Sequence, residues 1–401
     1  MAKLLWSRRS VVRFLGSLAV LPFPHRTRKR TPATVDNNIL DGIGVNVRLS
    51  DITPTLVSKA KALGFSWLRT DVRWARIERD GGTFDFSAER SAFALARTGG
   101  FRILGILAYG HPIHTQNRAP STAAEREGFA RFAEAAEREL GNLVDGWEVW
   151  NEPNHPLFWP PAPDARAFVA LFERAAEAIW QVRPQRQLVA GGLSEVDQAY
   201  LDQIRRPVAA FLRRGPVALS LHPYRKSNPE TLFGDLSKAG LIDATGRAVT
   251  PEGVPIWITE WGYCRLWPAV GPTLQGEMDV RIPMVTAALG VPLTILFELV
   301  DGGPQTKSQY TCGLLEAGSL RPHPAAQLWE QGAWLFRQVS VERPGVVQVN
   351  GHWSVAAVGG SVSWGEGPAV AGLCSDSLGP NGSAVPGLRV GNTVICYTRQ
   401  S

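Results

Sequence analysis

Two short stretches carry a glutamate in a setting that could do chemistry. The first is WEVWNEPN at residues 147–154, where Glu152 follows Asn151, and the second is WITEWGY at residues 257–263, which contains Glu260. Each glutamate follows a run of apolar and aromatic residues, as expected where a buried strand ends at a polar edge. Two carboxyl groups that face each other can break a glycosidic bond. One protonates the leaving oxygen, and the other attacks the anomeric carbon or activates water.

Eight short apolar runs, separated by helical patterns, would have to position these glutamates. In the two clearest helical stretches, residues 122–140 and 164–182, apolar residues recur every three or four positions. Thr122 and Asp164 stand where N-caps belong. The apolar runs are GIGVNV (42–47), SWLRTDV (66–72), RILGILAYG (102–110), VDGWEVW (144–150), QLVAGGLS (187–194), VALSLHPY (217–224), PIWITEW (255–261) and LTILFELV (293–300).

Apolar strands joined by helices predict a parallel sheet that is covered on its outer face. Eight such units predict an α/β fold of the (β/α)8 TIM barrel type rather than an open sheet. The chain contains no G-x-G-x-x-G or G-x-x-x-x-G-K-S/T phosphate loop, which excludes the main competing α/β proteins. After residue 338 the pattern changes to short alternating runs broken by glycine, typical of strands and hairpins. We therefore divide the chain into a basic leader (1–35), a barrel (36–338) and a small C-terminal β appendage (339–401).

The two glutamate motifs resemble those of a known group of enzymes. WNEPN after the fourth predicted strand and ITEWG at the seventh look like the signatures of the clan A glycoside hydrolases, the retaining (β/α)8 enzymes. The segment GFSWLRTDVRWARIERDGGTFDFS (64–87) further resembles the early part of family 39 and family 5 members. The resemblance covers residues 41–335 and implies an activity like that of β-xylosidases, endoglycosidases or cellulases.

Carried over by position, the resemblance implies that Glu152 is the general acid/base and Glu260 the nucleophile. Asn151 would hydrogen-bond the sugar 2-hydroxyl, a contact that tightens in the oxocarbenium-like transition state. Arg69 would keep Glu260 charged, whereas the apolar neighbours of Glu152 would favour its protonated form. The resemblance also implies that the H-x-Y sequence on the sixth strand, His222 and Tyr224, lines the site, with the tyrosine beside the nucleophile. It further implies that His111, after the third strand, is a substrate-side donor.

Other residues near the predicted mouth leave two interpretations open. The chain has fourteen tryptophans, which suit both core packing and sugar stacking; we place Trp159 and Trp261 in the substrate site on this basis, with plain packing as the alternative. His111 is open to a purely structural role as well. Many clan A members carry a tryptophan at the end of strand eight, whereas this chain reads ILFELVDGG at 295–303, so we expect Glu298 to contact the sugar there. Asp71 and Arg73 are expected to form an ion-paired rim.

The charge of the chain is unevenly placed. The net charge is +6, but basic residues concentrate in the first 30 residues, which contain no acidic residue, so that the remainder is close to neutral. This distribution argues against a nucleic-acid-binding protein. Ser7-Arg8-Arg9 followed by an apolar run resembles a twin-arginine export signal, which predicts a periplasmic or secreted protein; a basic tail or a mis-assigned start codon are the alternatives. No stretch beyond it approaches ~18 consecutive apolar residues, so no transmembrane helix is expected.

The cysteines fit no metal-site spacing. If the protein is exported, two disulfides can form, and otherwise four thiols remain. We expect neither a metal nor an organic cofactor. The four residues are Cys264, Cys312, Cys374 and Cys396.

These features predict a retaining glycoside hydrolase that cleaves a β-linked polysaccharide or oligosaccharide by double displacement. The alternative from a different class is a non-hydrolysing carbohydrate-binding or exopolysaccharide-assembly protein on a barrel scaffold. The presence of both Glu152 and Glu260 argues against that alternative, and a turnover assay separates the two.

Overall fold

All eight apolar runs form strands, and these strands close into a barrel. The computed structural model describes residues 39–80, 82–268, 270–303 and 311–336, together with six strands between residues 339 and 395. The barrel order is β1 to β8, every neighbouring pair is parallel, and β8 pairs with β1. The predicted (β/α)8 barrel is thereby confirmed. Its strands are β1 (Ile43–Asn46), β2 (Trp67–Arg73), β3 (Arg102–Ala108), β4 (Gly146–Val149), β5 (Gln187–Ser194), β6 (Val217–His222), β7 (Ile256–Trp261) and β8 (Thr294–Leu296).

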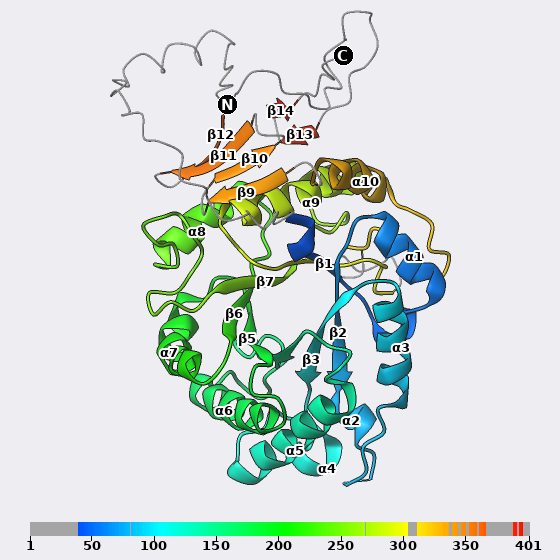
Figure 1. The fold of residues 1–401 in the computed structure, drawn as a ribbon, viewed down its shortest axis with the longest axis vertical. Helices are drawn as coiled ribbons and strands as arrows, with labels where there is room; N and C mark the ends of the chain where they lie inside the picture. The colour runs from blue at the N-terminus through cyan, green and yellow to red at the C-terminus, as the bar shows by residue number, and fades with distance from the viewer. Residues whose placement is uncertain are drawn as a thin grey trace, which may run out of the picture. The chain divides into compact units, whose positions relative to one another are not determined.

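Helices follow every strand of the barrel and surround it (Figure 1). Two helices follow β2 and two follow β3, while each other strand is followed by one. The helices are α1 (Pro54–Ala62), α2 (Trp74–Ile77), α3 (Ser87–Thr98), α4 (Pro112–Thr115), α5 (Ala123–Leu140), α6 (Ala165–Val182), α7 (Gln198–Ala209), α8 (Leu232–Lys238), α9 (Gly271–Ala288) and α10 (Pro324–Phe336). Short 3-10 turns occupy Ile39–Gly42, Leu49–Asp51, Ala210–Arg213 and Pro229–Thr231.

The two long helices begin where the sequence predicts. The Thr122 side chain accepts from the backbone N–H of Glu125, and the Glu125 side chain accepts in return from the Thr122 N–H, which completes a capping box at α5. The Asp164 side chain accepts from the N–H groups of Arg166 and Ala167 at the start of α6. Both caps satisfy backbone donors that a helix cannot pair internally.

Side chains that alternate along the strands fill the barrel in layers. Trp67 of β2 and Trp257 of β7 meet edge to face, with ring centroids 6.4 Å apart, within a buried apolar cluster. Two residues further along the same strands stand Arg69 and Thr259, which point to the same side because successive side chains alternate. The interior is therefore apolar at the start of the strands and polar toward their carboxyl ends, where catalytic groups of such barrels stand.

The C-terminal region forms strands, as the sequence predicts. Four of them make an antiparallel sheet in the order β12-β11-β10-β9, and the last two pair as an antiparallel hairpin. The strands are β9 (Val339–Arg343), β10 (Val346–Val349), β11 (Trp353–Val358), β12 (Ser361–Gly365), β13 (Leu388–Val390) and β14 (Thr393–Ile395). The predicted leader, Cys374 and Cys396 lie outside the described residues. Within the described part of the chain, no helix is long and apolar enough to span a membrane.

Candidate active site

The two predicted catalytic glutamates meet at the carboxyl end of the barrel. Glu260 is the fifth residue of β7, and Glu152 lies three residues beyond the end of β4. Their side chains are 14% and 11% exposed, respectively. One carboxylate oxygen of each glutamate and one ring nitrogen of His222 all lie within 4.8 Å of one another. The pair is thus close enough to act on opposite sides of a single bond.

The backbone around Glu152 adopts a conformation that few residues accept. Trp150 and Glu152 both have positive φ, at 70° and 45°, and the Glu152 N–H donates to the carbonyl of Gly192 at 3.0 Å. A Cβ atom at Gly192 would come within 2.7 Å of a Glu148 oxygen and 2.8 Å of a His222 nitrogen. Position 192 therefore requires glycine, and the left-handed Trp150 and Glu152 form a strained segment of the kind often found at functional sites.

Arg69 contacts both the predicted nucleophile, Glu260, and Asn151, the residue before the predicted acid. It is fully buried; its Nη1 donates to Glu260 Oε2 at 2.9 Å and its Nη2 donates to Asn151 Oδ1 at 3.0 Å. Burial by itself would lower the pKa of Arg69, but the charges of Glu148 and Glu260 outweigh it and raise the pKa above its ordinary value. Because Arg69 occupies the Asn151 oxygen, the Asn151 amide N–H groups are the donors that remain for a ligand.

Glu148 is a member of the site that the sequence analysis missed. It stands inside β4, is completely buried, and accepts from Arg69 Nε at 2.7 Å and from Ser220 and Thr259 hydroxyls at 2.8 Å each. Burial would raise the pKa of Glu148, but the Arg69 charge, His222 and these hydrogen bonds lower it below its usual value. A signal was present in the sequence: side chains alternate along a strand, so Glu148 points to the face opposite Trp147 and Val149, which is the barrel interior if those two pack against the helices.

His222 contacts the predicted acid directly. Its Nδ1 lies 3.0 Å from Glu152 Oε1 and 3.8 Å from Glu260 Oε2, and its Nε2 lies 3.1 Å from the Thr259 hydroxyl. The Thr259 hydroxyl donates to Glu148, so it can accept from His222 Nε2–H, whereas Arg69 Nη2, 3.4 Å away, can donate only to an Nε2 that carries no proton. With its proton on Nε2, the imidazole presents an acceptor at Nδ1, to which a protonated Glu152 can donate.

Tyr224 completes the surroundings of Glu260. Its hydroxyl donates to Glu260 Oε1 at 2.7 Å, while Arg69 holds the other oxygen. Burial and then the Glu260 charge raise the pKa of Tyr224 well above its ordinary value, so the phenol keeps its proton and remains a donor. The two carboxylates therefore differ in environment: Glu260 receives a cation and a phenol, and Glu152 contacts an imidazole.

Glu298 follows β8 and lies near these groups. Its side chain is 5% exposed, and its Oε2 is 3.5 Å from the Arg48 guanidinium. Its Oε1 is buried and has no hydrogen-bond partner among the described residues. Burial raises the pKa of Glu298 to about 8, helped by the charges of Glu260 and Asp301 against that of Arg48. A group with this pKa is mostly protonated at pH 7.

A disulfide ties the loops that follow β7 and β8. Cys264 and Cys312 are bonded to each other. The Cys312 carbonyl accepts from the Gln275 side chain at 2.9 Å and faces the backbone N–H of Glu298 at 3.5 Å. The bond therefore joins the segment just after Glu260 to the one that carries Glu298.

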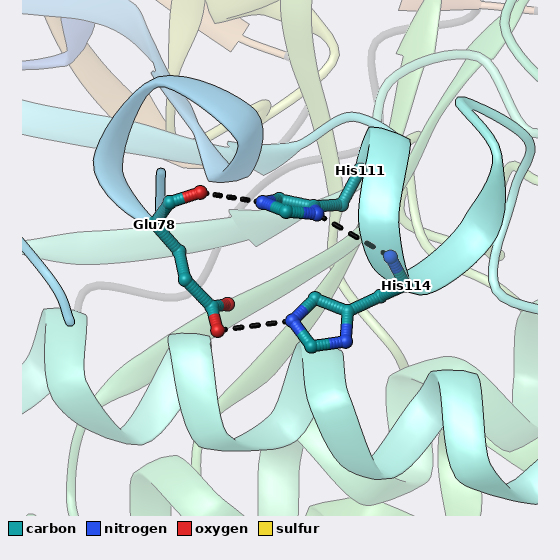
Figure 2. Close-up of side chains that lie close together, drawn as sticks. All are labelled: Glu78, His111 and His114. Atoms are coloured by element: carbon teal, nitrogen blue, oxygen red, sulfur yellow. Dashed lines mark hydrogen bonds and ion pairs between the residues drawn. The ribbon is translucent and has the colours of Figure 1, made fainter. Parts of the chain in front are cut away.

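The structure does not bring His111 to the glutamate pair. His111 is completely buried, and its Nδ1 accepts from the backbone N–H groups of Ile113 and His114, which makes it the N-cap of α4. Its Nε2 donates to the Glu78 carbonyl, as Figure 2 shows. Since both ring nitrogens are occupied, the prediction of a substrate-side donor was wrong, and the structural alternative holds.

Glu78, His111 and His114 form a cluster that has the residue types of a metal site (Figure 2). His114 Nε2 bonds to Glu78 Oε1 at 2.9 Å, and its ring stacks on Trp74 with centroids 5.0 Å apart. The other Glu78 oxygen accepts from the Trp74 indole at 2.6 Å. His111 has no nitrogen lone pair left for an ion, so the cluster fastens α4 to the segment after α2 instead.

The two predicted tryptophan platforms are also packed away from any ligand. Trp159 is 2% exposed and meets Trp150 edge to face at 5.3 Å, and Trp261 is fully buried beneath the Arg225 guanidinium. A sugar cannot stack on a ring whose faces are already covered by protein atoms. The prediction that these two tryptophans contact substrate was therefore wrong, and the packing alternative applies. The expected ion-paired rim of Asp71 and Arg73 is confirmed, with a separation of 2.9 Å.

Comparison with known proteins places the fold among glycoside hydrolases. A family 39 glycoside hydrolase from the gut symbiont Bacteroides cellulosilyticus is 19% identical, with a TM-score of 0.62 over 81% of this chain and 69% of that one. A monomeric beta-xylosidase from Caulobacter crescentus is 14% identical, with a TM-score of 0.57 over 85% and 76%. GH5_18 from Streptomyces cattleya, solved in complex with GlcNAc, is 17% identical, with a TM-score of 0.59 over 76% and 81%. The chain shares its barrel fold with these enzymes. No protein-family model and no curated protein matches the sequence.

Proposed function

We propose that the chain is a retaining β-glycoside hydrolase. The observation that carries the proposal is the approach of one Glu152 oxygen and one Glu260 oxygen to within 4.8 Å. Retaining glycosidases place their carboxyl groups about 5–5.5 Å apart, whereas inverting ones leave roughly 6.5–9.5 Å for a water molecule. The 4.8 Å limit joins one oxygen of each group, and so close an approach leaves little room for an intervening water, which supports direct attack by a carboxylate.

Glu260 is the nucleophile in this proposal. Hydrogen bonds from Arg69 and Tyr224 to its two oxygens stabilise the charged form that attack requires. In the first step a Glu260 oxygen forms a bond to the anomeric carbon as the bond from that carbon to the leaving oxygen breaks. The Asn151 amide donates to the sugar 2-hydroxyl as positive charge develops on the ring.

Glu152 is the acid and then the base. It gives its proton to the leaving oxygen in the first step, and the His222 ring at 3.0 Å orients the carboxyl group. In the second step Glu152 takes a proton from water, whose oxygen attacks the anomeric carbon and releases Glu260. Two inversions at one carbon give net retention.

Each glutamate can be tested by its own chemical signature. Glu260→Ala is expected to abolish hydrolysis of activated aryl β-glycosides, and added azide to restore turnover with an inverted glycosyl azide as the product. Glu152→Ala is expected to lower kcat on substrates with poor leaving groups by about 10²–10⁴-fold, the usual contribution of general acid catalysis. Azide should rescue that variant with the retained product. Glu173→Ala, on the exposed part of α6, serves as the control.

The result that overturns the assignment is equally definite. Near wild-type turnover by Glu260→Ala would remove it from the role of nucleophile. If the wild-type chain binds β-linked glycans and hydrolyses none, the non-hydrolysing alternative is correct.

The proposed substrate is a β-linked oligosaccharide or polysaccharide. The solved structures that share the fold include those of a beta-xylosidase, an exo-beta-1,4-mannosidase and a xylanase. Their identities to this chain are 14%, 16% and 14%, so the β linkage is what we carry over and the sugar is left to experiment.

We also propose that the protein is exported, to the periplasm or the medium. The Ser7-Arg8-Arg9 leader motif supports this, as does the disulfide between Cys264 and Cys312, since disulfides persist mainly in oxidising compartments. Fusion of residues 1–35 to a reporter that is active only after twin-arginine export tests the proposal. Replacement of Arg8 and Arg9 by lysine should block export.

A further inference from the structure

A cavity of about 410 Å³ opens beside Tyr224. Its volume falls within the ~300–1,000 Å³ of ligand pockets. The walls come from the loop that follows β5, the first residue of α7, the loop that follows β6, and α8. Tyr224 lines the cavity, and its hydroxyl donates to Glu260 at 2.7 Å, so the cavity adjoins a residue that contacts the proposed nucleophile. The polar residues that line it are Glu195, Gln198, Tyr224, Arg225, Asp235 and Lys238.

Arg225 is a nearly buried charged residue in the wall of this cavity. Its side chain is only 8% exposed, and its guanidinium lies over the Trp261 ring at 5.4 Å. Nε donates to the Pro223 carbonyl at 3.0 Å, and Nη1 donates to Thr231 and to Asp235 at 3.1 and 2.8 Å. Within the described part of the chain Nη2 has no hydrogen-bond partner, so it is the donor of Arg225 that remains for a ligand.

The charges of the lining residues balance. Arg225 and Lys238 supply two cations, and Glu195 and Asp235 supply two carboxylates. An anionic ligand would meet Glu195, and a cationic one would meet Arg225. Alternating donors and acceptors suit an uncharged molecule that carries many hydroxyl groups, because each hydroxyl both donates and accepts.

The cavity wall is attached to the catalytic residues. The Glu195 N–H donates to the His222 carbonyl at 3.0 Å. Asn154, two residues after Glu152, bonds through its side chain to both backbone groups of Ser194 at 2.9 Å and to Asp197 at 3.2 Å. These contacts hold the loop after β5 in fixed register with the acid and with its histidine, so a ligand in the cavity is positioned relative to the reacting bond.

We propose that this cavity is a second sugar subsite, which holds an uncharged monosaccharide unit of the same chain whose glycosidic bond is cleaved, with Arg225 as its specificity-determining residue. The inference rests on the proposed hydrolase function. It means that the enzyme recognises a neutral oligosaccharide or polysaccharide over more than one unit.

Comparison of short and long substrates tests the subsite. The short substrates are p-nitrophenyl β-glucoside, β-xyloside and β-mannoside, and the long ones are the corresponding β-1,4-linked tetrasaccharides. Arg225→Lys keeps the charge and removes the forked donor, and it should lower kcat/KM for the tetrasaccharide by about tenfold or more, as expected for loss of a charge-assisted hydrogen bond. It should leave kcat/KM for the aryl glycoside within twofold. Lys238→Ala removes only an exposed side chain, so this second variant should fold normally. It should lower kcat/KM for the tetrasaccharide a few-fold.

The matched control is Arg205→Lys. Arg205 is also a partly buried arginine paired with carboxylates, Asp202 and Glu252, but it stands on α7 and does not line the cavity. A binding readout that needs no turnover is titration calorimetry of Glu260→Gln with the same tetrasaccharides. Affinity should fall in Glu260→Gln/Arg225→Lys and stay unchanged in Glu260→Gln/Arg205→Lys.

Several results would overturn the subsite while leaving the hydrolase standing. They are an equal loss on short and long substrates, no loss on either, and tighter binding of tetrasaccharides that carry uronic acids than of neutral ones. Failure of Glu260→Gln to bind any neutral tetrasaccharide has the same meaning. Absence of hydrolysis by the wild-type chain on every substrate, in contrast, overturns the proposed function itself.

Discussion

Replacement of Glu298 by glutamine should make the protein more stable, and increasingly so as the pH rises. The carboxyl group is almost fully buried and lacks a partner for Oε1, and burial raises its pKa from the ordinary 4.5 to about 8. The folded state therefore holds a proton that the unfolded chain releases above pH 4.5. The folded protein accordingly loses stability between pH 4.5 and pH 8, where the group is finally forced to ionise in place.

The size of the effect follows from the same two values. A carboxyl pKa raised from 4.5 to about 8 corresponds to ~5 kcal/mol of lost stability once the pH exceeds both, at 1.36 kcal/mol per pH unit. Glutamine has the same shape and cannot ionise, so Glu298→Gln should match the wild type near pH 4.5. At pH 8 it should be more stable by several kcal/mol.

The assay is urea unfolding followed by tryptophan fluorescence at pH 5, 6.5 and 8, for the wild type and Glu298→Gln. Fourteen tryptophans give a strong signal, and Glu173→Gln, an exposed carboxylate on α6, is the matched control. The reasoning is refuted if the difference between Glu298→Gln and the wild type is the same at all three pH values. It is also refuted if the control shows the same trend.

Two further predictions concern the residues around Glu260. Tyr224→Phe removes the donor 2.7 Å from Glu260 Oε1 and should lower kcat on aryl β-glycosides about 10–100-fold, as expected for a hydrogen bond to a charged group worth ~1.5–3 kcal/mol; unchanged kcat would show that Arg69 alone suffices. Cys264→Ser/Cys312→Ser opens a loop closed by residues 48 apart and should lower the free energy of unfolding by about 2–4 kcal/mol, measured by urea unfolding, whereas added reductant should leave the stability of that double variant unchanged.

The sequence predicted those features that depend on local patterns. Eight apolar runs became eight strands because buried parallel strands need continuous apolar residues, and the caps at Thr122 and Asp164 depend on neighbours two or three residues away. The positions of Glu152, Glu260 and Tyr224 followed from their places at or just beyond strand ends, and that of Arg69 from its inward-facing place within β2. Barrel geometry brings such ends together wherever they lie in the chain.

The residues that were misplaced depend on contacts that no local pattern records. His111 has the right type and position for a ligand contact, but its ring lies against the N–H groups of its own helix and the Glu78 carbonyl. Trp261 ends β7 and Trp159 lies in the loop between β4 and α6, yet both rings are buried in the packing layer. Whether an aromatic side chain faces the mouth or the core depends on how loops fold back over it, which the sequence period does not specify.

The cavity walls were beyond sequence reasoning for a similar reason. Arg225 and Lys238 are thirteen residues apart, and neither belongs to a recognisable motif. They line one space because α8 returns toward the end of β6, where Asp235 holds Arg225 at 2.8 Å. Their pairing is a result of tertiary structure alone.

Arg69 has two carboxylate partners, and this duplication has a consequence for the reaction cycle. In the proposed covalent intermediate Glu260 becomes an ester and loses its charge. A fully buried guanidinium with that carboxylate as its only counterion would then be stranded without a compensating charge, which is strongly destabilising. Glu148 stays ionised throughout and keeps contact with Arg69 Nε at 2.7 Å. Arg69 therefore keeps one carboxylate partner, Glu148, while Glu260 alternates between a carboxylate and an ester. The covalent intermediate can form without leaving an unpaired cation in the barrel interior.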